Sequence, residues 1–189
     1  RLRPKVKETA FTLWKIYIGF TIIEIFLLGT LGGMSLFDSV NHGFTTMATG
    51  GFSTRDASIG YYDSLKVEAI IIIFMFIGGI NFTLIWFLLA KEYVKAFKDE
   101  EFKTYLVYIF VAVAVMMVAL VTTNVNLGDS FRQSLFQTIS IGTSTGYTTQ
   151  DYMTWPAVTQ FILMILMIVG ACAGSTSGGL KLMRIILAF

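Results

Sequence analysis

Two long apolar stretches constrain this sequence more than any other feature. Residues 67–90 (VEAIIIIFMFIGGINFTLIWFLLA) and 105–123 (YLVYIFVAVAVMMVALVTT) carry very few polar side chains. A helix needs about 20 apolar residues to cross the hydrocarbon core of a bilayer. Only 14% of the chain is charged, whereas a soluble domain carries about a quarter. The sequence therefore predicts an all-α integral membrane protein.

The positions of the basic residues predict its orientation. Lysine and arginine gather at residues 1–15, at 91–103, and near the end of the chain at Lys181 and Arg184. The remaining basic residues are Arg55, Lys66 and Arg132. Cytoplasmic loops are enriched in such residues, so we expect both ends of the segment and the 91–103 connector on the cytoplasmic side. Both ends also read as the edges of a piece cut from a longer polypeptide.

An internal repeat with an offset of 95 residues sets the architecture. At this offset Gly51 pairs with Gly146, and Phe52 with Tyr147. Each unit reads as a spanning helix, a half-length helix, a glycine- and hydroxyl-rich strand, and a second spanning helix. The fold expected is two parallel repeats, the first over residues 1–95 and the second over 96–189.

The half-length helices are expected at residues 36–48, capped by Ser35 or Asp38, and at 131–142, after the turn signals in 126–130. A helix of about a dozen residues is roughly 18 Å long, too short for a hydrocarbon core of about 30 Å. We therefore expect re-entrant pore helices. The alternative is a pair of amphipathic helices that lie on the surface.

The strands that follow, residues 49–53 (TGGFS) and 144–148 (STGYT), have the composition of a cation filter. Stacked backbone carbonyls can replace the hydration shell of a monovalent cation, and glycine permits the unusual dihedral angles required. The aromatic after each central glycine is expected to pack behind its strand and hold the width of the filter. The expected ion-coordinating residues are Thr49, Gly50, Gly51, Phe52, Ser144, Thr145, Gly146 and Tyr147.

Four segments carry a resemblance to a known family: residues 45–64, 78–82, 142–156 and 170–184. They resemble the Trk/Ktr/HKT superfamily of potassium transporters, specifically the bacterial Trk-type pore subunit. That family has four repeats around a pseudo-fourfold pore, and this chain resembles the second and third. The resemblance implies potassium as the substrate, bound at the eight filter residues, with no covalent cofactor. Both central glycines favour potassium over sodium.

The second repeat ends in 171-ACAGSTSGGL-180, which either breaks the closing helix or makes a close helix–helix contact through small residues. The resemblance favours an intramembrane gating loop beneath the filter. Its expected residues are Gly174, Ser175, Thr176, Ser177, Gly178, Gly179 and Lys181. Alternatively, Lys181 extends toward the cytoplasm. The counterpart in the first repeat, 78-GGINF-82, predicts a kink or a close contact rather than a loop.

Four other positions leave alternatives open. Glu24 lies in an apolar segment, where a carboxylate is a functional candidate unless a hydroxyl or water satisfies it. His42 is expected to be a packed side chain rather than a ligand. Asp56 and Asp151 follow their filters at the same distance, where they either concentrate cations or cap turns.

No catalytic triad, zinc site or phosphate loop is present in the sequence, so we expect no enzyme and no nucleic-acid partner. The function expected is potassium uptake across the plasma (inner) membrane, as part of the ion-conducting subunit. The alternatives are an ion-coupled cation carrier, including a sodium-permeable variant, and a non-conducting scaffold with a pore-like fold. The partners expected are the lipid bilayer and two further repeats. By resemblance, a second copy in a homodimer and a cytoplasmic nucleotide-binding regulatory subunit are expected as well.

Overall fold

The computed structural model describes residues 2–188, so Arg1 and Phe189, at the ends of the predicted repeats, lie outside the described residues. Within this range the chain is helical and contains no β-strand, so the two predicted filter strands are extended loops. The elements in order are α1 (Leu2–Thr30), α2 (Leu36–Met47), η1 (Ser58–Tyr62), α3 (Leu65–Gly79), α4 (Phe82–Leu89), α5 (Tyr93–Lys98), α6 (Glu100–Val121), α7 (Leu127–Gly142), η2 (Tyr152–Thr154), α8 (Ala157–Val169) and α9 (Leu182–Ala188).

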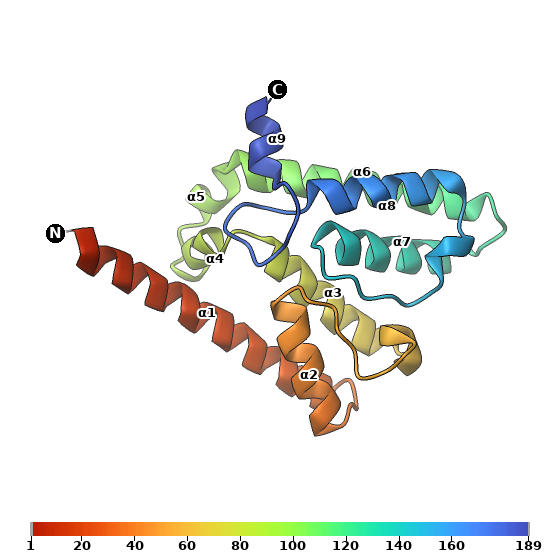
Figure 1. Ribbon diagram of the computed structural model, residues 1–189, viewed down its shortest axis with the longest axis horizontal. Helices are drawn as coiled ribbons and strands as arrows, with labels where there is room; N and C mark the ends of the chain where they lie inside the picture. The colour runs from red at the N-terminus through yellow and green to blue at the C-terminus, as the bar shows by residue number, and fades with distance from the viewer. Residues whose placement is uncertain (1, 189) are drawn as a thin grey trace.

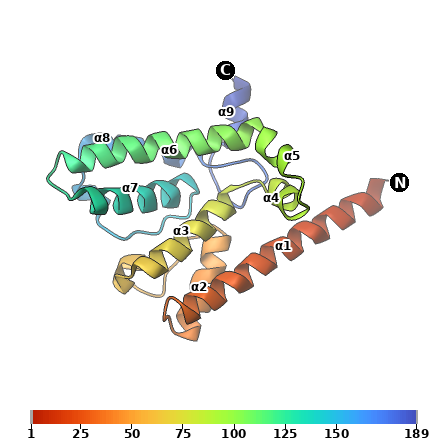
Figure 2. The same cartoon turned by 180° about the vertical axis from the view of Figure 1, so that it is seen from behind.

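The two halves share one arrangement of helices (Figure 1). In the first half α1, α2 and α3 pack against one another, and in the second half α6, α7 and α8 do the same. The halves meet mainly where α3 packs against α7. Figure 2 shows the same two groups from behind.

The pore helices begin at polar caps. The hydroxyl of Ser35 accepts a hydrogen bond from the Asp38 backbone N–H at 3.1 Å, so Ser35 caps α2. Helix α7 begins at Leu127, before the predicted position 131, because Asn126 is its N-cap and the polar residues after it form the first turn. Small residues bring α2 close to α1: a Cβ at Gly43 would lie 2.5 Å from Cγ1 of Ile25.

Both inner helices are interrupted. Helices α3 and α4 are bent by 106° at a two-residue break, so the kink predicted at 78–82 is confirmed and is sharper than a bend within one helix. The Asn81 side chain stabilises the new start by accepting from the Thr83 N–H at 2.8 Å. In the second half, α8 ends at Val169 and α9 begins at Leu182. We call the intervening residues 170–181 the broken-helix loop.

Two described helices, Lys7–Thr30 within α1 and Glu100–Val121, are long and apolar enough to cross a membrane. The bent α3–α4 pair makes a third if counted as one span. Helix α8, with 13 residues, is shorter. The inner helices are interrupted because residues 78–82 and the broken-helix loop bind each other's backbones, as described below.

Candidate functional site

The backbone has the same dihedral pattern in both filter segments, residues 49–53 and 144–148. The first residue of each has a positive φ, 50° at Thr49 and 59° at Ser144. The central glycines do so too, with φ of 67° at Gly51 and 88° at Gly146. A positive φ is uncommon for threonine and serine. Finding it at equivalent positions indicates a backbone shape that the fold imposes twice.

One pore-helix residue holds each filter segment from behind. The carbonyl oxygen of Thr45 accepts from the N–H groups of Gly50 at 2.7 Å and Gly51 at 3.3 Å. At the repeat offset, the carbonyl oxygen of Ser140 accepts from Thr145 at 2.9 Å and Gly146 at 3.1 Å. The filter N–H groups therefore point toward the pore helices.

The hydroxyls of the same two residues make a second matched contact. Oγ1 of Thr45 lies 2.8 Å from the carbonyl oxygen of Phe52 and donates to it. Oγ of Ser140 donates to the carbonyl oxygen of Tyr147 at 2.7 Å. These two residues were missed in the sequence analysis, although the offset of 95 pairs them and both carry hydroxyls.

The remaining filter carbonyls have no such partner. Among residues 2–188, no group donates a hydrogen bond to six carbonyl oxygens, those of Thr49, Gly50, Gly51, Ser144, Thr145 and Gly146. Stacked backbone carbonyls without protein donors are the kind of ligand that replaces the hydration shell of a monovalent cation. Six oxygens free of protein donors on two matched segments therefore suit a cation.

The two filter segments lie side by side. A Cβ on Gly51 would overlap the carbonyl oxygen of Thr145, so only glycine fits there. The equivalent position on Gly146 has no heavy atom of the described chain within 4 Å. The first filter segment thus has the second segment beside its central glycine, whereas no described residue lies beside the central glycine of the second segment.

The filter aromatics differ from the expectation that each packs behind its own strand. Tyr147 is fully buried, and its hydroxyl lies 2.5 Å from Oγ1 of Thr45 on the pore helix of the other repeat. Phe52 is instead 76% exposed. The expectation is therefore wrong for Phe52 within this chain. The tyrosine packs against α2 of the first repeat, whereas the described residues leave most of Phe52 uncovered.

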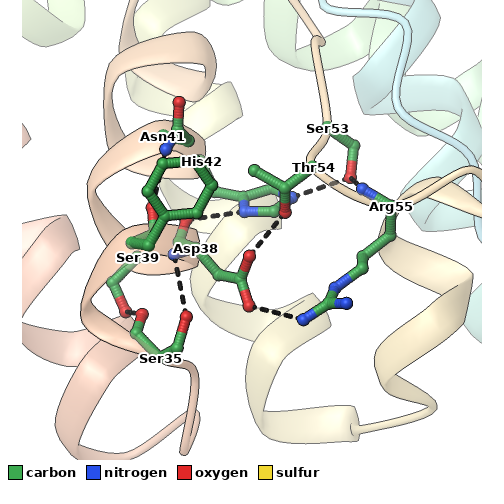
Figure 3. Close-up of polar contacts among 9 residues, drawn as sticks. Ser35, Asp38, Ser39, Asn41, His42, Ser53, Thr54 and Arg55 are labelled. Carbon is green, nitrogen blue, oxygen red and sulfur yellow. Dashed lines mark hydrogen bonds and ion pairs between the residues drawn. The ribbon is translucent and has the colours of Figure 1, made fainter.

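An ion pair fixes the C-terminal end of the first filter segment to α2 (Figure 3). The Asp38 carboxylate accepts from Oγ1 of Thr54 at 2.6 Å and from the guanidinium of Arg55 at 3.0 Å. The hydrogen bond from Thr54 is the largest influence lowering the pKa of Asp38 to about 2, assisted by Arg55 and opposed by burial. Asp38 therefore stays ionised at the start of its helix.

His42 continues this contact, as expected of a packed side chain. Its Nδ1 lies 2.7 Å from the carbonyl oxygen of Asp38, which can only accept, so Nδ1 carries the proton. Nε2 then accepts from the hydroxyl of Ser53 at 2.9 Å (Figure 3). Its repeat counterpart Gln137 is also buried, but no described residue bonds its side-chain amide.

The second filter segment is held at its C-terminal end by the first repeat. The N–H of Gly60 in η1 donates to the carbonyl oxygen of Thr148 at 3.1 Å, and the Thr148 N–H donates to Oγ of Ser58 at 3.3 Å. Asp151 caps η2 by accepting a hydrogen bond from the Met153 N–H at 3.0 Å. Of the two roles expected for this residue, concentrating cations or capping a turn, the structure shows capping.

The broken-helix loop lies against the first residue of each filter segment. Oγ1 of Thr49 donates to the carbonyl oxygen of Thr176 at 2.8 Å, and a Cβ at Gly178 would lie 3.5 Å from the Ser144 side chain. The loop also binds the first repeat where its inner helix is interrupted. There the backbone N–H of Thr176 donates a hydrogen bond to the carbonyl oxygen of Gly78 at 3.1 Å. The loop is thus a true break rather than a close helix contact.

Lys181 folds back onto the loop instead of extending toward the cytoplasm. Its ammonium group donates to the carbonyl oxygen of Ser177, to Oγ of Ser177 at 3.0 Å and to Oγ of Ser175 at 3.5 Å. Glycines at positive φ allow the turns, with 70° at Gly174 and 81° at Gly179. The lysine therefore stabilises the shape of the loop.

Two buried carboxylates differ in their partners. Glu24 is fully buried and the Thr46 hydroxyl lies beside it, but that hydroxyl donates to the His42 carbonyl oxygen at 2.7 Å. Neither Glu24 oxygen has a partner among the described residues. Glu101, which the sequence analysis missed, is 3% exposed and accepts two backbone hydrogen bonds. The described residues contain no cluster of His, Cys, Asp or Glu side chains that could hold a metal ion.

Comparison with known proteins places this geometry in a family. The TrkH family, described as "Cation transport protein", matches residues 2–189. The chain is 40% identical to the Trk system potassium uptake protein TrkH of Escherichia coli K12, covering 100% of this chain and 40% of that protein. It is 34% identical to the Trk system potassium uptake protein TrkG of the same strain, covering 100% of this chain and 39% of that one.

A solved structure agrees. The crystal structure of the potassium transporter TrkH from Vibrio parahaemolyticus superposes with a TM-score of 0.91 at 39% identity, covering 98% of this chain and 40% of that chain. The chain spans about two fifths of the length of these relatives. It therefore belongs to the TrkH family of cation transport proteins, among the Trk-type potassium transporters.

Proposed function

We propose that this chain is part of the ion-conducting subunit for potassium uptake across the plasma (inner) membrane. Its two filter segments bind dehydrated potassium through backbone carbonyls. The observation that carries the proposal is the set of six carbonyl oxygens without protein donors on two segments of matched φ. Stacked carbonyls of this kind replace the hydration shell without placing a fixed charge in the membrane.

Two segments do not enclose an ion, so the working filter includes two further repeats. The open side of Gly146 and the exposed ring of Phe52 support this. Gly51 has Thr145 beside it and Tyr147 has α2 behind it, so a following and a preceding repeat would complete the same contacts for the other two. A homodimer and a cytoplasmic nucleotide-binding subunit belong to the proposal through family membership alone.

The broken-helix loop is proposed as the gate. It lies beneath the filter, bonded to Thr49 and close to Ser144. Each of its contacts to the filter is a single hydrogen bond or a van der Waals contact, so the loop can leave while the filter stays held by Thr45 and Ser140. Conduction then requires displacement of the loop.

Rubidium flux into liposomes that contain the complete four-repeat protein tests the proposal. Gly146→Ser is expected to abolish the preference for potassium and rubidium over sodium, because serine strains a φ of 88°. Gly128→Ser is the matched control, because Gly128 lies at the start of α7 with open space around it. Unchanged flux and ion preference in Gly146→Ser would refute the filter assignment. Flux that requires a second coupled ion would favour the carrier.

A further inference from the structure

The carboxylate of Glu101 lies at the point where the two ends of the broken-helix loop come together. Glu101 is in the first turn of α6, the outer helix of the second repeat, and is 3% exposed. No described basic side chain forms a salt bridge with it. A buried carboxylate is costly unless hydrogen bonds satisfy it.

Both of its bonds go to the loop region. Oε1 accepts from the N–H of Ala173 at 2.6 Å and from the N–H of Met183 at 3.1 Å. Ala173 lies near the start of the loop, and Met183 is in the first turn of α9, where N–H groups have no partner within the helix. One oxygen thus joins two points that are ten residues apart in sequence.

The rest of the loop's base is held by backbone bonds alone. The backbone N–H of Lys181 donates to the carbonyl oxygen of Val169 at 3.0 Å, and the N–H of Leu182 donates to the carbonyl oxygen of Ala171 at 3.1 Å. Glu101 is the side chain that ties this base to another helix. Charge-assisted hydrogen bonds are about twice as strong as neutral ones, so its loss affects the base more than the loss of any one backbone bond.

We propose that Glu101 is a latch that holds the base of the broken-helix loop against α6 and so sets how often the loop leaves the filter. The role of the loop as a gate rests on the proposed function, whereas the latch is a statement about the loop's position. Glu101 is a positioning residue and does not touch the ion.

Cys172 provides a reporter, because it is the single cysteine of this chain and lies fully buried beside Ala173. Its rate of modification by a water-soluble methanethiosulfonate reagent is measured in the complete protein, with cysteines outside residues 1–189 replaced by serine. Glu101→Ala is expected to raise this rate about tenfold, which corresponds to the loss of one charge-assisted hydrogen bond. Glu101→Gln, which keeps an acceptor, is expected to raise it less. Glu100→Ala, an exposed carboxylate in the same turn, is expected to leave it unchanged.

The following results test the latch and separate it from the proposed gate. A wild-type rate in folded Glu101→Ala, or an equal rise in Glu100→Ala, overturns the latch. If Glu101→Ala does not fold, the comparison of Glu101→Gln with the wild type decides, and equal rates overturn the latch. Faster modification together with unchanged rubidium flux supports the latch and refutes the gate, which separates this inference from the proposed function.

Discussion

Gly51 and Thr145 are in direct contact across the two repeats, with the Thr145 carbonyl oxygen in the place that a side chain on Gly51 would occupy. The residues lie 94 positions apart in sequence, and their contact sets the spacing of the two filter segments. Gly51 is thus required for two reasons, its φ of 67° and the close approach of its neighbour.

Gly51→Ala is therefore expected to disrupt the filter, because the alanine must displace the Thr145 backbone and adopt a φ of 67°. We expect loss of rubidium flux as well as of ion preference. In the complete protein a following repeat would lie beside Gly146 as the second repeat lies beside Gly51, so Gly146→Ala is expected to have an equal effect. Flux assays on both variants, with Gly128→Ala as the control, test this. A much smaller effect of Gly146→Ala would contradict the proposed position of the following repeat.

Thr45→Val keeps the shape of the side chain but removes a hydroxyl that bonds both the Phe52 carbonyl and the Tyr147 hydroxyl. We expect a loss of about 2 kcal/mol in stability, about 1 kcal/mol for each hydrogen bond, together with weaker discrimination against sodium. Ser140→Ala removes only the bond to the Tyr147 carbonyl and is expected to cost about 1 kcal/mol. Thr104→Val is the control, because its exposed hydroxyl bonds only the carbonyl of its own helix, at 2.8 Å. Denaturation in detergent and sodium flux are the measurements, and an equal effect in Thr104→Val would contradict the assignment.

The sequence predicted the elements that depend on local signals. The turn and cap signals before α2, offered as Ser35 or Asp38, and the glycines of residues 49–53 and 144–148 can be recognised from adjacent residues. For 171–180 the residues alone left a break and a close helix contact open, and the family resemblance favoured the break. The repeat offset then placed the two filters in equivalent positions. These features required no knowledge of which helix packs on which.

The features that were missed depend on contacts between distant residues. Glu101 reaches Ala173 and Met183 across more than 70 residues, as the separations of 72 and 82 show. The kink at 78–82 was predicted, but its angle of 106° was not, because the bend lies where the broken-helix loop of the second repeat binds the first repeat. The exposure of Phe52 follows from packing between repeats, which a residue's own neighbours in sequence do not reveal.

Asp38 and Arg55 form an ion pair with unequal burial, since the side chains are 5% and 39% exposed. Asp38→Ala is expected to cost more stability than Arg55→Ala, because it also leaves the Thr54 hydroxyl without its acceptor. An exposed partner contributes about 1 kcal/mol or less, which sets the expectation for Arg55→Ala. Denaturation of both variants in detergent measures the difference, and a larger loss in Arg55→Ala would contradict it.

Arg132 of α7 binds Glu68 of α3 through two hydrogen bonds of 2.7 Å and so joins the two repeats. Arg132→Gln leaves a buried carboxylate without its counterion and is expected to cost about 3 kcal/mol, the lower end for such pairs because Arg132 is partly exposed. The double variant Glu68→Gln with Arg132→Gln is expected to recover part of that loss. Lys66→Gln, at an exposed position nearby, is the control. A fully additive double variant would show that the pair does not couple the repeats.

The most direct test of the account is anomalous scattering from rubidium in crystals of the complete four-repeat protein. The account predicts a rubidium peak on the pore axis, bounded by the carbonyl oxygens of residues 49–51 and 144–146. A filter with the same backbone and no peak at that level, or a peak bound by side-chain carboxylates elsewhere, would contradict it.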